Sequence, residues 1–320
     1  MPNYQGVWSL SEQYQNAAAW PLPPLTGDIG LAIAGTSWSG HTNYQGIEYV
    51  IISTLGNGTE FGDLDVARSG GCALGSSTRY ITGGNSADPT TTCFGTFSTR
   101  GNATEFGELT VRLYGACTGA SNNTRGVIAG GNIATGHSNV IAYCTIATAA
   151  DFTDFGDLTE ERATSAGLAN TTRAVFGGGD PTGASTSNTI DYITIASTGN
   201  AIDFGNLPTA RQLRGGASSS TRGLFMGGYQ SSAPYNLNDI EYITIASAGN
   251  ATDFGDLTVA RRIGQAMSNA TRAIAFGGNA GAQSMDYVTI ATTGNATSFG
   301  TLTAYYGTDS AACSNSHGGL

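Results

Sequence analysis

The tract GNxxxFGxL, or a near copy of it, recurs through the whole chain. Its phenylalanine occupies six positions that lie 45 to 50 residues apart: Phe61, Phe106, Phe155, Phe204, Phe254 and Phe299. Self-similarity at a period of this length is typical of repeat architectures, in which each repeat is one supersecondary unit. The chain is therefore expected to fold as one array of similar units rather than as two unrelated domains.

The order of segments between these tracts is also fixed. The fifth unit contains ARRIGQAMS from Ala260, NATRAIAFGG ending at Gly278, MDYVTIAT from Met285 and ATSFGTL ending at Leu302. Each segment is short, rich in Thr, Ile, Val, Tyr or Phe, and bounded by Gly, Asn or Ser, which indicates a strand. The repeat thus predicts six units of four strands.

Several features of each unit resemble the kelch repeat. They are an (I/M)-(D/E)-Tyr strand, the aromatic residue of the FG tract, a Leu-x-x-Ala-Arg tract, and a glycine doublet that closes an apolar strand. The doublets are Gly83-Gly84, Gly130-Gly131, Gly177-Gly178, Gly227-Gly228 and Gly277-Gly278. Kelch repeats usually have Trp where this chain has Phe, so it resembles a divergent member. The resemblance covers about residues 28 to 320 and implies an all-β, six-bladed, kelch-like β-propeller with four strands per blade.

The two ends of the chain complement each other. The last unit stops at AACSNSHGGL, which matches a first strand and the turn that follows it. The missing second strand occurs as GDIGLAIAG from Gly27, followed by GIEYVIIS and GTEFGDL. We therefore expect the N- and C-terminal strands to share one blade, which removes free sheet edges. The predicted domains are a leader or anchor segment, 1–27, and the propeller, 28–320.

The segment before the ring has a different character. GVWSLSEQYQNAAAWP resembles a short leader of bacteriophage tail-fibre and other virion proteins. It predicts a short amphipathic helix over residues 9–19, capped by Ser9 or Ser11 and stopped by Pro21. That helix either packs on the side of the propeller or anchors the chain to other virion proteins.

Charge narrows the range of partners. The net charge is −10, and all thirteen basic residues are arginine. Such a chain is repelled by phosphate backbones, so no nucleic-acid partner is expected. No run of 18 apolar residues is present, so no membrane insertion is expected. Charged residues make up only 11% of the chain, and solubility from Ser, Thr and Asn suits a virion or extracellular location.

The polar residues that recur in every repeat are expected to have structural roles. One arginine series repeats at the start of the inner strand: Arg68, Arg112, Arg162, Arg211 and Arg261. A second series lies in the SN-x-TR turn: Arg79, Arg125, Arg173, Arg222 and Arg272. Either series could bind an anion in the channel, but we expect them to pair with repeated acids or with strand-end carbonyls. The Asn-x-Thr sequences are explained by turn chemistry rather than glycosylation.

The five cysteines contain no CxxC motif and are expected to be buried, reduced thiols. The acids of the ATDFGDL tracts reproduce no calcium-loop pattern. We therefore predict no metal and no cofactor.

Strand direction places the loops after the glycine doublets on one face and the SN-x-TR and STGN turns on the other. The turns have nearly the same sequence in every unit, whereas the loops differ from unit to unit. The loops begin at Thr36, Asn85, Asn132, Gly179, Tyr229 and Asn279. Unlike loops on a rigid scaffold are how many proteins present a binding surface, although such loops can also vary because nothing constrains them. The candidate ligand-binding residues are Trp38, His41, Tyr44, Asp88, His137, Asp180, Tyr229, Tyr235, Asn236 and Gln283.

No catalytic constellation stands out from the repeat. The chain has no GxSxG or HExxH motif, and its three histidines are scattered. We therefore expect a protein that is not an enzyme: a phage tail-fibre or tip propeller that binds a host-surface glycan or protein receptor. One alternative is a structural decoration or connector protein of the virion. A second is a carbohydrate-active enzyme, because some kelch-like propellers are oxidases or sugar mutarotases.

Overall fold

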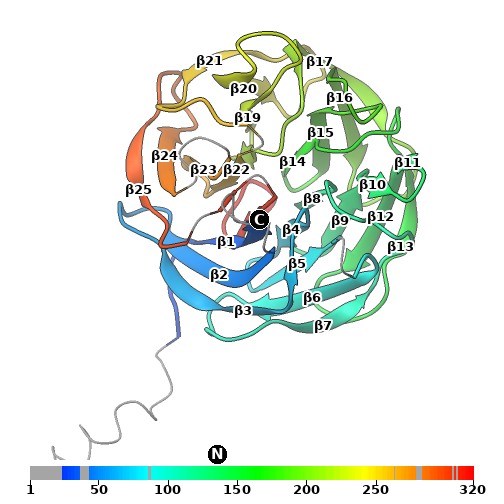
Figure 1. Cartoon of the computed structure of the whole chain (residues 1–320), viewed down its shortest axis with the longest axis vertical. Coiled ribbons are helices and arrows are strands. Elements are labelled where there is room, and N and C mark those ends of the chain that lie inside the picture. Colours follow the sequence, from blue (N-terminus) through cyan, green and yellow to red (C-terminus); the bar gives the residue numbers. More distant parts are fainter. Residues whose placement is uncertain are drawn as a thin grey trace, which may run out of the picture.

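Six four-stranded antiparallel sheets surround one axis, so the chain forms a six-bladed β-propeller (Figure 1). The structure is a computed structural model, and it describes residues 24–36, 43–85, 88–262, 264–278, 283–304, 306–307 and 309–320. Strands, turns and irregular segments account for all of these residues, with no helix among them. The helix expected over residues 9–19 lies outside the described residues.

The blades are numbered in chain order, and their strands are given from the axis outward. Blade 1 consists of β26 (Ala311–Ser314), β1 (Ile29–Thr36), β2 (Asn43–Ile51) and β3 (Thr59–Arg68). Blade 2 consists of β4 (Cys72–Gly75), β5 (Arg79–Gly83), β6 (Thr91–Thr96) and β7 (Thr104–Glu108). Blade 3 consists of β8 (Thr118–Ser121), β9 (Arg125–Ala129), β12 (Val140–Thr145) and β13 (Thr153–Asp157), with a small hairpin of β10 (Asn132–Ile133) and β11 (Gly136–His137) in its loop.

The second half of the ring repeats the same order. Blade 4 consists of β14 (Ala166–Ala169), β15 (Arg173–Gly179), β16 (Ser187–Thr194) and β17 (Ile202–Arg211). Blade 5 consists of β18 (Gly216–Ser218), β19 (Arg222–Tyr229), β20 (Asn236–Thr244) and β21 (Thr252–Asp256). Blade 6 consists of β22 (Gln265–Ser268), β23 (Arg272–Phe276), β24 (Ser284–Thr289) and β25 (Thr297–Thr301).

Blade 1 joins the two ends of the chain, as the sequence predicts. Strand β26 pairs antiparallel with β1, with Ser314 opposite Gly30 and Ala311 opposite Ile33. The innermost strand of every blade contacts those of both neighbours, so no blade has a free inner edge. Closing the ring in this way protects strands that would otherwise template aggregation.

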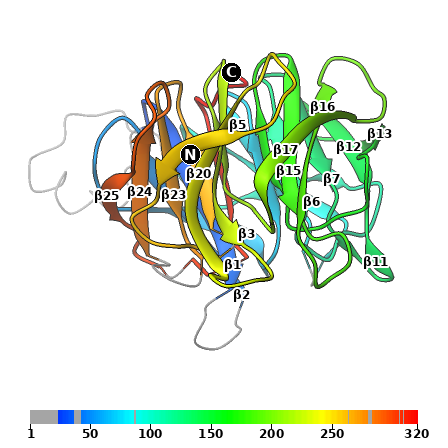
Figure 2. The same cartoon turned by 90° about the horizontal axis from the view of Figure 1, so that it is seen from above.

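Two faces follow from this connectivity. The turn face carries the connections between first and second strands and between third and fourth strands. The variable-loop face carries the six connections between second and third strands, which follow Thr36, Gly83, Ala129, Gly179, Tyr229 and Phe276. In Figure 2 the hairpin strand β11 lies toward this face, whereas the C-terminus lies at the other.

Edge-to-face aromatic pairs and arginines fill the space between neighbouring blades. One aromatic residue of each third strand, a tyrosine in five blades and Phe94 in blade 2, meets the FG phenylalanine of its own blade, as in Tyr143–Phe155 at 5.8 Å between ring centroids. The turn arginine lies over the same tyrosine, as Arg125 does over Tyr143 at 4.4 Å. It also donates a hydrogen bond to a carbonyl of the following blade, here Ile195 O at 2.8 Å. The turn arginines are thus structural, as expected from the repeat.

A second set of contacts, made by hydrogen bonds, links the outer strands of neighbouring blades. The side chain of one Asn or Asp in each blade accepts a hydrogen bond, at 3.0 or 3.1 Å, from a backbone N–H in the outer strand of the preceding blade. The six acceptors are Asn57, Asn102, Asp151, Asn200, Asn250 and Asn295. The adjoining FG glycine has no room for a side chain, because a Cβ at Gly205 would lie 2.5 Å from Gly249 O. This close approach of two backbones explains why the FG tract recurs in every unit.

Buried arginines lie where the chain enters four of the blades from the variable-loop face: Arg68, Arg162, Arg211 and Arg261. Arg162 pairs with Asp191 at 2.8 Å and Arg261 with Asp286 at 3.1 Å, while Arg211 pairs with Glu241. In two of these pairs a threonine hydroxyl also donates to the carboxylate, from Thr159 and from Thr258.

The other positions of this series depart from the pattern. Leu113 fills the buried place in blade 3, and Arg112 beside it is exposed, so the sequence assignment of Arg112 is wrong by one residue. The carboxylate position opposite Leu113 is occupied by Ala142, and the two side chains share one apolar cluster. Arginine and acid have therefore been replaced together in this blade.

Candidate functional site

The variable loops of blades 4 and 5 are held by short backbone bridges at their base. Ala163 pairs with Asp180, and Gln212 pairs with Tyr229, each through two N–H···O bonds of 2.7 to 2.9 Å. Gln212 also donates its side-chain amide to the Asp180 carboxylate at 3.0 Å. The two neighbouring loops are thus joined to each other as well as to the blades.

Asp180 orders the loop of blade 4. One of its carboxylate oxygens accepts backbone N–H bonds from Thr182 (3.1 Å), Gly183 (2.8 Å) and Ser185 (3.1 Å). The side chain is buried, so its oxygens are used within the protein. Asp180 therefore shapes the candidate surface from beneath.

Two tyrosines in the loop of blade 5 form a stacked pair. The rings of Tyr229 and Tyr235 lie 6.3 Å apart at an angle of 15°. The guanidinium of Arg262 lies 4.3 Å from the centre of the Tyr229 ring. Tyr235 remains 56% exposed, the largest such fraction among the aromatic side chains that the structure describes. Aromatic faces presented in this way suit stacking against sugar rings or packing against a protein partner.

The loop conformation that brings these rings together is fixed by its own hydrogen bonds. The backbone N–H of Gln230 donates to Tyr235 O at 2.9 Å, and the Gln230 side-chain amide donates to Pro234 O at 2.8 Å. Asn236 pairs with Tyr229 at the start of β20. A preorganised loop loses less entropy on binding than a free one.

The remaining predicted residues are spread around the face. Tyr44 is exposed and meets Tyr306 edge to face at 6.1 Å. Burial of part of the ring and then the carboxylate of Glu48 raise the pKa of Tyr44. Asp88 and His137 are half-buried, and the buried Nδ1 of His137 has no hydrogen-bond partner among the described residues.

Gln283 is exposed and donates to Thr303 O at 3.1 Å. Trp38 and His41 lie outside the described residues. The structure therefore gathers Asp180, Tyr229, Tyr235 and Asn236 into one region and leaves the others apart.

Two residues of this region were not predicted as ligand-binding. Gln212 and Arg262 each follow a repeated arginine directly, and both depart from the other units at that place. The doublet Arg261-Arg262 is the only Arg-Arg pair in the sequence, and this departure from the repeat was the signal available. The stacking of Arg262 on a loop of the neighbouring blade depends on the fold and is not visible in the sequence.

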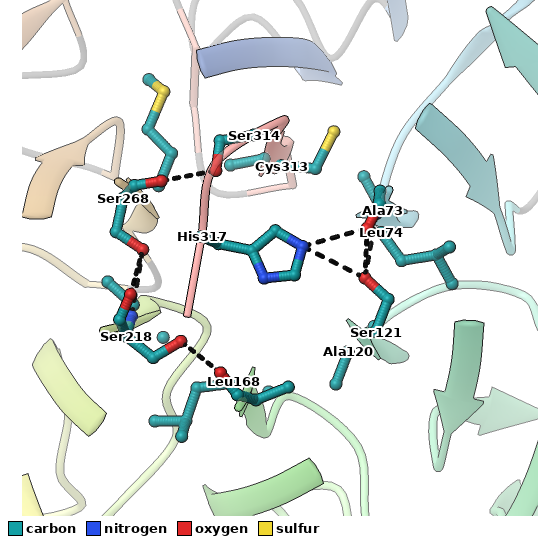
Figure 3. A pocket seen from close by; sticks show the side chains of 18 of the residues that line it. Ala73, Leu74, Ala120, Ser121, Leu168, Ser218, Ser268, Cys313, Ser314 and His317 are labelled. Carbon is teal, nitrogen blue, oxygen red and sulfur yellow. Dashed lines mark hydrogen bonds between the residues drawn. The ribbon is translucent and has the colours of Figure 1, made fainter. Parts of the chain in front are cut away.

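The central channel offers a second hollow, at its turn-face end. A cavity of about 60 Å³ is lined by the last residues of the six innermost strands and by His317 (Figure 3). Four serines each donate a hydroxyl to a backbone carbonyl of the preceding blade: Ser121, Ser218, Ser268 and Ser314. These hydroxyls are therefore engaged in holding the inner strands together.

The C-terminal tail closes this end of the channel. Nε2 of His317 lies 3.0 Å from Gly75 O and 3.3 Å from the Ser121 hydroxyl, as Figure 3 shows for the hydroxyl. Gly318 N–H donates to Ser218 O at 3.0 Å. Burial lowers the pKa of His317, and the Gly75 carbonyl opposes this only in part. The neutral imidazole thus serves as a plug at this end of the channel.

Other classes of site find no support in the described part of the chain. Its residues contain no group of three or more His, Cys, Asp or Glu side chains that could hold a metal ion. Within the same residues, no helix is long and apolar enough to cross a membrane. The stacked tyrosines of blade 5 are therefore the strongest candidate for a binding site.

Comparison with known protein families, and comparison with curated proteins, each gave no match for this chain.

Proposed function

We propose that this chain is a non-enzymatic, kelch-like propeller of a virion, at a phage tail fibre or tip, that binds a host-surface glycan or protein receptor. The binding surface is the variable-loop face, and residues 1–27 attach the chain to other virion proteins. The kelch-like doublets and the phage-type leader in the sequence support the class of protein. The ordered, exposed Tyr235 supports the location of the surface.

The observation that carries this proposal is the stack of Tyr235 on Tyr229, whose ring also contacts Arg262. Tyrosine combines an apolar ring with a polar hydroxyl group, so an exposed tyrosine held in an ordered loop suits contact with a partner. Aromatic and arginine side chains also supply a large share of binding energy at interfaces. The six loops around it differ in sequence, which suits a surface adapted to one particular partner.

The test compares wild-type protein with Tyr235→Ala in binding to host cells and to an array of immobilised glycans. Truncation of one anchoring tyrosine costs about 2 kcal/mol, so we expect binding about thirtyfold weaker. Thermal unfolding should be unchanged, because the side chain is largely outside the core. Binding by Tyr235→Ala at the wild-type level would place the functional surface elsewhere.

A decoration or connector role is the second candidate, and two exposed apolar side chains favour it. Leu55 and Ile202 are 60% and 59% exposed and lie toward the turn face, away from the variable loops. Neighbouring subunits packed there would cover them. Ile202→Ser serves both as the control for Tyr235→Ala and as the test of this role: it should abolish incorporation into particles only if the connector role is correct.

A further inference from the structure

Two cysteines from neighbouring blades meet inside the ring. Cys72 begins β4 in blade 2, and Cys117 directly precedes β8 in blade 3. A hydrogen bond joins their Sγ atoms at 3.1 Å, and both atoms lie 3.6 to 3.7 Å from Gly83 O. Both thiols are reduced and buried. Their separation needs little further movement to reach the bond length of a disulfide, about 2.05 Å.

The pair borders a small polar cavity. This cavity measures about 30 Å³, and Cys72, Cys117, Thr118, Ser165, Arg214 and Gln265 contribute to its wall. It shares the wall residues Ala73, Gly119, Gly167, Gly216, Ala266 and Ala312 with the larger cavity of Figure 3, so the two adjoin along the channel. A water molecule needs roughly 10–15 Å³ of such volume, so a molecule as small as hydrogen peroxide fits.

Arg214 supplies a positive charge beside the thiols. It enters from blade 5 and is 6% exposed. Its guanidinium crosses the axis to donate to Gly70 O at 2.8 Å and to Ser310 O at 3.4 Å. Nε has no hydrogen-bond partner, and among the described residues no carboxylate forms an ion pair with Arg214. A buried cation without a counter-ion favours negative charge on its neighbours.

The five cysteines consequently differ in acidity. The hydrogen bond with Cys72, and then the charge of Arg214, hold the pKa of Cys117 below its ordinary value although burial opposes them. The same hydrogen bond raises the pKa of Cys72. Burial raises the pKa of Cys93 and of Cys144 to about 12 and also raises that of Cys313. The thiolate is the reactive form, so Cys117 is the nucleophile of the set.

We propose that Cys72 and Cys117 form an oxidation site, at which a small peroxide converts the two thiols into a disulfide between blades 2 and 3. The Cys117 thiolate attacks one oxygen of hydrogen peroxide, and the O–O bond breaks. Cys117 becomes a sulfenic acid, and the released hydroxide takes up a proton to give water. The sulfur of Cys72 then attacks the Cys117 sulfur, and the hydroxyl group leaves with the Cys72 proton as a second water. The two thiols are oxidised, and the peroxide is reduced.

The experiment uses the reduced full-length chain treated with an equimolar amount of hydrogen peroxide. Free thiols are then alkylated in denaturant, and peptides are mapped by mass spectrometry without reduction. We expect a peptide pair joined by Cys72 and Cys117, with Cys93, Cys144 and Cys313 still alkylated. If Cys72 and Cys117 remain alkylated, or react no faster than Cys144, the proposal is wrong.

Two variants test the roles of the neighbours. Arg214→Gln should slow disulfide formation severalfold, because it removes the positive charge that favours the Cys117 thiolate. Its matched control is Arg112→Gln, at an exposed arginine outside the candidate binding site, which should leave the rate unchanged. Cys72→Ala should accumulate sulfenic acid on Cys117, trapped by dimedone, because the resolving thiol is gone. Equal rates of disulfide formation in the two arginine variants would show that Arg214 has no role in the reaction. Should either variant fail to fold, the wild-type peptide map decides alone.

Discussion

The side-chain oxygen of Asn315 accepts a hydrogen bond at 2.7 Å from the backbone N–H of Ile29, a residue 286 positions away in the sequence. In blade 6 the corresponding Asn269 accepts from the N–H of Arg272 within one continuous turn. The strand register gives Ile29 the place of Arg272. Blade 1 therefore rebuilds the same turn from two separate pieces of chain.

This reconstruction predicts that the last residues are essential for folding. A chain ending at Asp309 lacks β26, so β1 loses its inner partner and presents an unpaired edge to solvent. We expect little soluble, monodisperse protein by size-exclusion chromatography. A truncated chain that stays folded with unchanged thermal stability would contradict the closure.

A milder change isolates the turn itself. Asn315 also donates its amide to Gly27 O at 3.0 Å, so Asn315→Ala removes two hydrogen bonds at the junction. We expect the free energy of unfolding to fall by about 1–2 kcal/mol, measured by urea denaturation. Ser316→Ala is the control, because the Ser316 hydroxyl has no hydrogen-bond partner among the described residues. It should unfold at the wild-type urea concentration.

The hydrogen bonds that asparagine side chains accept between the outer strands of neighbouring blades predict which substitutions are tolerated there. Asn250 accepts from the N–H of Asn206, and Asp151 performs the same task in blade 3. Asn250→Ala should therefore lower the free energy of unfolding by about 1 kcal/mol, while Asn250→Asp should change it by less than about 0.5 kcal/mol.

Gly205 lies against the same junction, at φ +145°. A substitution of Gly205 should therefore lower the free energy of unfolding more than Asn250→Ala does. Gly205→Ala should cost about 2 kcal/mol or more, because backbone strain and the contact with Gly249 O act together. The measurement is again the urea midpoint. A Gly205→Ala protein as stable as wild type would show that the close approach of the two backbones does not explain why the FG glycine recurs.

The pair of Arg211 and Glu241 predicts a pH dependence of stability. Pro208 stands where the equivalent pairs have Thr159 and Thr258, so no hydroxyl reaches Glu241, and its Oε2 is buried without a partner. Burial raises the pKa of Glu241 to about 7 from an ordinary value of 4.5, although Arg211 opposes the shift. The folded state then holds a proton that the unfolded state releases. Stability should fall as the pH rises from about 4.5 to 7, by up to about 3 kcal/mol.

Two variants check the origin of that slope. Glu241→Gln removes the titrating group, so this component of the pH dependence should disappear from unfolding curves recorded between pH 4 and pH 8. Pro208→Thr supplies the missing hydroxyl and should stabilise the protein at and above pH 7. An identical slope in wild type and Glu241→Gln would assign the dependence to another group.

The joint replacement in blade 3 predicts a coupled pair of mutations. Leu113→Arg alone buries a charge opposite Ala142 and should cost about 3–5 kcal/mol. Adding Ala142→Asp recreates the pair seen between Arg162 and Asp191 and should recover at least half of that loss. Urea midpoints of the four proteins complete a double-mutant cycle. Additive effects would mean that the two positions do not communicate.

The fold could be predicted because the same pattern of four strands recurs in each unit. The partial units at the two ends of the chain together supply the remaining blade. The sequence could not reveal contacts between units. The approach of Cys72 to Cys117, the path of Arg214 across the axis and the stacking of Tyr235 on Tyr229 all depend on how blades and loops meet in space. The misplaced Arg112 has a similar cause: a repeat shifted by one residue looks intact in the sequence, and only burial identifies Leu113 as its equivalent.

The chain enters and leaves the ring on the same side. Leu25 donates its N–H to Ser98 O, in the third-to-fourth-strand turn of blade 2, and residues 315–320 close the channel at the turn face. The loops of Tyr44, Tyr229 and Tyr235 project from the other side. Immobilising the protein through a tag after Leu320 would therefore orient every molecule alike, with Tyr44, Tyr229 and Tyr235 directed at whatever is offered in solution.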